Sequence, residues 1–148
     1  MKSKQILGKE KMTKKLYKLN NQSSEWLADL EFMQDEQKFL EHLLSSHFLD
    51  LSTEKYYDAA KKLISKLKDV ETMGNSIYET LQIHNKHLAT LIESLQLKGK
   101  KEFKKEHKQI EKDFETYVLK FKYVKKKIFG IIKDIMKIQK QKLLIKEL

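Results

Sequence analysis

The 148-residue chain contains no cysteine and no proline, and only four of its residues are glycine. Without cysteine it has no disulfide framework, no thiolate metal ligand and no cysteine nucleophile. Four scattered glycines cannot build a glycine-rich phosphate-binding loop. No apolar run is long enough for a transmembrane helix or a signal peptide, so we expect a cytoplasmic protein. Arginine is also absent, because all 31 basic residues are lysine.

The residues that are abundant favour helices. Lys, Leu, Glu, Ile and Gln dominate the chain, and a helical protein with short turns can do without proline. We expect a single domain over residues 1–148, with helices at about 5–49, 53–97 and 100–146. A bend near 20–24 is left open, because Asn and Ser are indifferent helix formers. Ser52 is expected to cap the second helix, and Gly99 to end it.

Apolar residues recur at alternating spacings of three and four in each predicted helix, which is the pattern of packed helices. This apolar seam runs over Met12–His47, Tyr56–Leu95 and Phe103–Ile145. Short turns make neighbouring helices antiparallel. The sequence therefore predicts an all-α fold, an elongated antiparallel up-down-up three-helix bundle with coiled-coil-like packing.

Folding the chain at the two predicted turns gives a register for the seam. It places Trp26 level with Ile77 and Phe121, and it separates His84 from His107 by two layers. Charge favours the same topology, because residues 21–50 carry seven acids and one lysine, whereas residues 120–148 carry ten lysines and two acids. Asp29 and Glu36 are expected to face Lys122, Lys125 or Lys127.

Histidine is the residue type in this chain whose side chain is best suited to metal binding or catalysis. The chain has five, His42, His47, His84, His87 and His107. The pair at 84 and 87 has the spacing of helical metal ligands, but no seam position is acidic, as a metal site in a bundle core requires. We therefore expect buried histidines with local hydrogen-bond partners, and no metal ligand, cofactor-binding residue or catalytic residue.

The third predicted helix carries the clearest functional signal. Lysines alternate with apolar and aromatic residues in the segment 121–129, a composition that suits an anionic membrane or a nucleic-acid backbone. The absence of arginine argues against sequence-specific DNA recognition. The candidate anion-binding residues are Lys120, Lys122, Lys125, Lys126, Lys127 and Lys133.

Three functions remain open from the sequence. The first is a non-enzymatic adaptor, structural or regulatory protein that acts through protein–protein contact, either with a protein partner or as a homo-oligomer, and that takes no small-molecule substrate. Apolar residues beside the seam would supply the contact surface. The alternative is a peripheral protein that binds an anionic membrane or nucleic acid without sequence specificity through its lysine-rich faces. The remote alternative is a metal-binding helical bundle.

Overall fold

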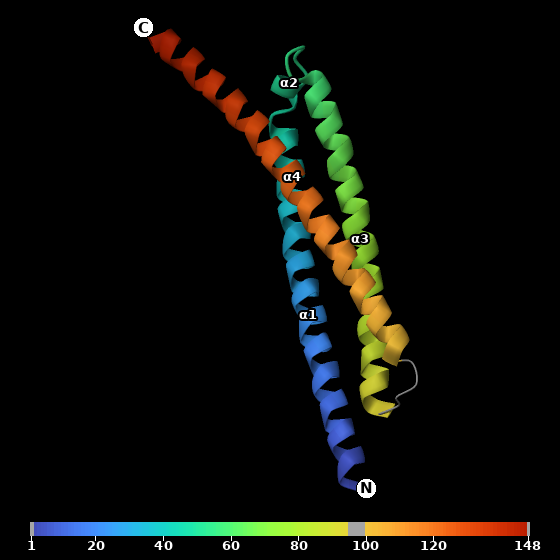
Figure 1. Ribbon diagram of the computed structural model, residues 1–148. Helices are drawn as coiled ribbons and strands as arrows, with labels where there is room; N and C mark the ends of the chain where they lie inside the picture. The colour runs from blue at the N-terminus through green and yellow to red at the C-terminus, as the bar shows by residue number, and fades with distance from the viewer. Residues whose placement is uncertain (1, 95–99, 148) are drawn as a thin grey trace. The chain divides into compact units, whose positions relative to one another are not determined.

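The computed structural model describes the backbone of residues 2–94 and 100–147, and the side chains of residues 11, 14–93 and 101–147. This described part is 95% helical and has no strand, which confirms the all-α class. Its four helices are α1 (Lys2–Ser46), α2 (Phe48–Leu51), α3 (Tyr57–Ser94) and α4 (Lys100–Glu147) (Figure 1). None of these helices, over the residues described, has a stretch apolar enough to cross a bilayer.

The helix boundaries differ from the sequence-based ones at the first turn. Helix α1 continues through residues 20–24, so there is no interruption at the Asn and Ser residues. The expected cap at Ser52 is wrong, because its hydroxyl donates back to the Phe48 carbonyl at 2.7 Å and ends the short helix α2. Helix α3 begins at Tyr57 instead, after a turn in which its N–H donates to the Thr53 carbonyl. Gly99 lies outside the described residues.

The chain divides into two compact units, each built from segments of three long helices. Unit 1 comprises residues 1–32 and 74–116, which belong to α1, α3 and α4. Its apolar core contains Leu16 from α1, Leu88 and Leu91 from α3, and Phe103 from α4. All four are seam residues, so the apolar periodicity correctly identifies the inward faces of this unit.

Unit 2 comprises residues 33–73 and 117–148, and it includes α2. Its buried residues again follow the seam; Leu40, Leu63 and Ile128 are examples. One seam position of α4 differs from the expectation, because Ile132 is buried and the expected Ile131 is only half-buried, whereas the next seam residue, Ile135, is buried as expected.

Polar contacts hold the α2–α3 turn of unit 2 against α4. The Tyr56 hydroxyl donates to Asp134 at 2.7 Å, and the Lys55 ammonium lies 3.9 Å from the same carboxylate. The Gln139 amide donates to Asp50 in α2 at 2.8 Å. The hydrogen bond to Asp134 is the main reason that the pKa of Tyr56 is raised above its ordinary value.

Beyond this last contact, the end of α4 is exposed. Every side chain from Gln139 to Glu147 is exposed, including the expected seam residues Lys142 and Ile145. Figure 1 shows these last turns diverging from α1 and α2. The seam expectation fails here because α1 ends at Ser46 and α3 begins at Tyr57, so neither helix supplies residues to cover this part of α4.

Gly130 provides a test of the α4 geometry. It is an exposed residue in the helix interior, and an added Cβ there would meet nothing within 4 Å. Gly130→Ala should therefore raise the free energy of unfolding by about 0.5–1 kcal/mol, measured by urea denaturation. The reverse change at an exposed position of α3, Ala89→Gly, should lower it by a similar amount. A loss of stability in Gly130→Ala would mean that the helix is not regular at this position.

Candidate functional site

Two histidines form a buried hydrogen-bonded pair in unit 1. His84 Nε2 on α3 lies 3.0 Å from His107 Nδ1 on α4. His107 Nε2 in turn lies 2.8 Å from Gln22 Oε1 on α1. Both imidazoles are almost completely buried, with 2% and 3% of their surface exposed. A continuous polar chain therefore links all three helices of this unit, and we call these three residues the histidine relay.

Aromatic rings enclose the relay. The His84 ring stacks on Phe103, with the ring centroids 4.1 Å apart and the planes within 4° of parallel. The Trp26 indole lies against His107 at 4.7 Å and against Phe114 at 6.1 Å between centroids. These rings exclude water, so the polar nitrogen atoms must find partners within the protein.

The histidine relay corrects the register expected from the sequence. The two histidines are direct neighbours, not two layers apart, and Trp26 contacts Phe114, seven residues before the expected Phe121. A shift of seven residues keeps the same side chains facing inward, so apolar periodicity cannot detect it. The expected register would have placed His84 opposite Phe114 and left its nitrogen atoms without a polar partner in α4.

The orientation of the Gln22 amide sets the protonation pattern of the neutral relay. Gln22 Oε1 accepts, so His107 carries its proton on Nε2 and its Nδ1 accepts from His84 Nε2–H. His84 Nδ1 is then a buried acceptor without a hydrogen-bond donor. It faces the Glu106 carboxylate at 3.5 Å, and His87 Nδ1 lies 3.6 Å from the same oxygen. His84 Nδ1 is thus the place where an added proton would meet a negative charge.

Burial makes protonation of both relay histidines unfavourable. It is the main reason that the pKa of His84 falls below its ordinary value, and nearby Glu106 opposes that shift. Burial, with His84 as a second cause, lowers the pKa of His107 to about 4. The relay is therefore uncharged at neutral pH, and a proton that enters it would be held between two rings and Glu106.

The other histidines do not join the relay. His42 is exposed and His47 is half-buried beside α2. Among the side chains that the structure describes, no group of three or more histidine and acidic residues has a geometry that could hold a metal ion.

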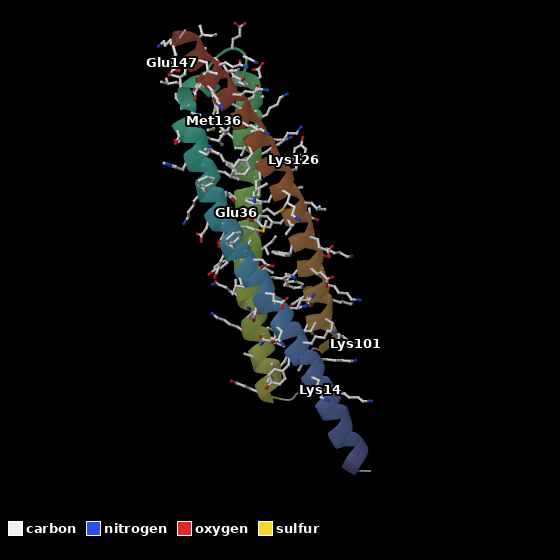
Figure 2. The ribbon with its side chains drawn as sticks, turned by 90° about the vertical axis from the view of Figure 1, so that its left-hand side faces the viewer. Lys14, Glu36, Lys101, Lys126, Met136 and Glu147 are labelled. Atoms are coloured by element: carbon white, nitrogen blue, oxygen red, sulfur yellow. The ribbon has the colours of Figure 1, made fainter. Side chains whose placement is uncertain are left out.

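The six candidate anion-binding lysines point in different directions. Lys125 forms an ion pair with Glu36 of α1, as the charge pattern predicts. Lys127 lies over the Tyr123 ring, and Lys120 lines a groove against α3. The remaining three are exposed on α4; Figure 2 shows Lys126 extending outward from that helix. Those three are Lys122, Lys126 and Lys133.

The ion pair in unit 2 lies beside a buried tyrosine. Tyr117 is fully buried in α4, and its burial, with the nearby negative charge of Glu36 as a second cause, raises its pKa to about 12. Gln37, also buried, donates its amide to the Leu67 carbonyl at 3.5 Å. The predicted register that places Trp26 level with Ile77 also places Gln37 level with Leu67, so this contact agrees with the predicted alignment of α1 and α3 in unit 2.

Two grooves flank α3 in unit 2. The α1/α3 groove has a volume of about 440 Å³, and exposed Phe48, Tyr57 and Ile64 are among its walls. The α3/α4 groove has about 430 Å³ and is lined by Met73, Leu119 and other residues of α3 and α4. The sequence did not identify these grooves, because their apolar residues lie beside the seam and were equally compatible with burial.

The relay should make the stability of the fold depend on pH. Because the pKa of His107 is lower in the folded protein than in the unfolded chain, the unfolded chain binds a proton first as the pH falls. The contribution of His107 to the free energy of unfolding is therefore fully present above pH 6.5, and it is lost as the pH falls toward 4. We expect a loss of roughly 2–4 kcal/mol from His107 over that range in urea denaturation. His84→Leu/His107→Leu should remove this part of the pH dependence, whereas His42→Leu should leave it unchanged. Equal slopes in the wild type and the double variant would contradict the assignment.

The two histidines should also be energetically coupled. His84→Leu or His107→Leu alone leaves a buried nitrogen atom without its partner, at a cost of about 1–3 kcal/mol. The double variant removes both partners, so its loss should be smaller than the sum of the single losses by about 1–2 kcal/mol. A double-mutant cycle at pH 7.5 measures this coupling. Strictly additive losses would mean that the rings do not interact.

Comparison with known proteins adds no further constraint on these sites. No family model matches the chain, and neither a curated protein nor a solved structure is significantly similar to it. Function must therefore be inferred from the contacts, grooves and exposed faces of the chain itself.

Proposed function

We propose that this is a non-enzymatic helical protein that binds another polypeptide, and that the α1/α3 groove of unit 2 is the binding surface. The observation that supports this proposal is the combination of an apolar floor and exposed apolar walls in that groove. Buried Leu44, Leu51 and Leu67 lie in its lining. The Phe48 side chain in its wall is 66% exposed, and Tyr57 is 53% exposed. Large apolar side chains in this setting favour an apolar ligand surface.

The dimensions of the groove suit a helix better than a small molecule. Its lining follows α3 from Tyr57 to Glu71, roughly 20 Å at 1.5 Å per residue. An amphipathic helix places apolar side chains at spacings of three, four and seven residues over such a length, and it would insert them between α1 and α3. The length and the open apolar walls therefore support a polypeptide occupant.

Charges on the rim indicate the sign of the partner. Lys61 and Lys68 lie on the α3 side of the groove, one on each side of Ile64, and Glu71 lies at the far end of that side, whereas Glu41 lies on the α1 side. A partner helix with acidic residues opposite the two lysines would complement this part of the rim. Rim charges of this kind set orientation and the rate of association more than affinity.

The proposal includes three further points, on the overall architecture, the cellular location and the kind of partner. The single up-down-up three-helix bundle over residues 1–148 is one, supported by the packing of α1, α3 and α4 segments within each unit. A cytoplasmic location is the second, and cell fractionation tests it. A partner protein rather than a second copy of this chain is the third, and light scattering of the purified chain distinguishes the two.

A photo-crosslinking residue at position 64 tests the groove. We expect one cellular polypeptide to be crosslinked, and the purified form of that polypeptide to bind the purified chain. Tyr57→Lys should weaken this binding at least tenfold, because it places a charge in an apolar contact. Ile83→Lys introduces the same charge at another exposed apolar residue of α3, in unit 1, so it is the matched control and should bind normally.

Two results would contradict the proposal. Binding that is unchanged in Tyr57→Lys would show that the polypeptide uses another surface. Crosslinks between two copies of the chain, together with a dimeric mass that Tyr57→Lys reduces to a monomer, would assign the groove to self-association instead.

A further inference from the structure

One side of α4 in unit 2 combines lysines with large apolar side chains, all of them exposed. We call this side the outer face of α4. It contains Lys122, Lys126, Phe129, Lys133, Met136, Lys137, Lys140, Leu143 and Leu144. Figure 2 labels two of its members, Lys126 and Met136.

Helical spacing places these residues on one side. At 3.6 residues per turn, all nine lie within an arc of about 120° of the helix circumference, so they share a single helix face. The neighbouring sides of α4 are occupied by other contacts, since Lys125 pairs with Glu36 of α1 and Tyr123 lies beside Lys66 of α3. The outer face is therefore the side of α4 that points away from the packed interior of unit 2.

The charge of the outer face has one sign. Between residues 117 and 146 the only acidic residue is Asp134, and it is bound by Tyr56 and Lys55 from the α2–α3 turn. Five lysines thus share a face without an acidic neighbour on it. Such a face attracts an anionic surface over distances of about a Debye length, roughly 8 Å at physiological salt.

The end of α4 supplies a second, independent observation. Its last nine described residues, Gln139 to Glu147, are all exposed, and Leu143 has 64% of its surface in water. A helical segment of this length has little stability of its own in water, because helices gain most of their stability from burying an apolar face. Leu143 and Leu144 are consequently apolar groups at the end of a helix that no other element of unit 2 covers.

We propose that the outer face of α4 binds an anionic lipid bilayer. The helix would lie in the plane of the bilayer surface, with lysine ammonium groups among the lipid phosphates and carboxylates. Phe129, Met136 and Leu143 would enter the boundary between headgroups and acyl chains. The long lysine side chains allow both contacts at once, because their apolar stems extend along the surface while the charged ends reach the headgroups.

The apolar members of the face favour a bilayer over a nucleic acid. Lysines alone would serve a phosphate backbone, and that contact would leave Met136, Leu143 and Leu144 in water. A bilayer takes up both kinds of side chain. The absence of an acidic residue on the outer face likewise distinguishes it from the mixed rim of the α1/α3 groove, so the two surfaces suit different partners.

Co-sedimentation with lipid vesicles tests the proposal. The full chain should bind vesicles of mixed phosphatidylcholine and phosphatidylserine, and not vesicles of phosphatidylcholine alone. Binding should weaken as salt rises, because salt screens the lysine charges. Each of Lys133→Ala and Lys137→Ala should lower the partition coefficient about fivefold. Leu143→Ser/Leu144→Ser should lower it about tenfold or more, since it removes the inserted apolar groups.

Matched controls are available in α3 of unit 1. Lys86 and Ile83 are exposed there, so Lys86→Ala and Ile83→Ser make the same chemical changes away from the outer face. Both controls should bind vesicles as the wild type does. All these substitutions are at exposed positions, and circular dichroism verifies that each variant is folded.

Three results would overturn the proposal. The first is equal sedimentation with neutral and anionic vesicles. The second is equal weakening by the outer-face variants and the controls. The third is tighter binding to a DNA or RNA duplex that is unaffected by Leu143→Ser/Leu144→Ser, which would assign the lysines to a phosphate backbone. These results do not affect the proposal for the α1/α3 groove, because the groove and the outer face of α4 have no residue in common.

Discussion

The need of two buried imidazoles for polar partners is the constraint on which the packing of this protein depends. Leucine and isoleucine seams tolerate several alignments that differ by seven residues, because each alignment buries similar apolar groups. His84 and His107 do not tolerate them, since a buried nitrogen atom without a partner costs about as much as a core substitution. The observed alignment joins the two rings by a hydrogen bond and adds a second one from His107 to Gln22 of α1. A few polar atoms thus select one register among several that the apolar residues allow.

Within unit 2, the contacts of α4 determine which of its surfaces remain open. In unit 2, α4 pairs with α1 through Lys125 and Glu36, and with α2 through Gln139 and Asp50. Its last turns consequently have no neighbouring helix, and their leucines stay in water. Lys125 forms an ion pair with Glu36, whereas its neighbours Lys122 and Lys126 are exposed on the outer face of α4. The alignment that satisfies the interior therefore leaves a charged, apolar helix end at the surface.

The sequence predicts those features of the fold that depend on one helix at a time. Periodicity identifies most of the inward residues of the long helices, except at the exposed end of α4, and charge identifies the contact between Glu36 and Lys125. It does not predict how far one helix slides along another, because a shift of seven residues leaves the pattern unchanged. It also misses the histidine relay, Lys137 and Lys140. The relay requires the register, and the two lysines become visible only when the spacing from Lys133 is continued to the end of α4.

The relay has one more consequence, which concerns the Gln22 side chain. With its oxygen toward His107, both N–H bonds of the relay point from α3 toward α1. If the amide rotated to present its NH₂ group, His107 would have to accept at Nε2 and donate from Nδ1, and His84 would have to move its own proton to Nδ1. Neither ring can change tautomer alone without two lone pairs or two hydrogens meeting. The three side chains therefore behave as one unit with two opposite polarities, and one amide rotation exchanges them.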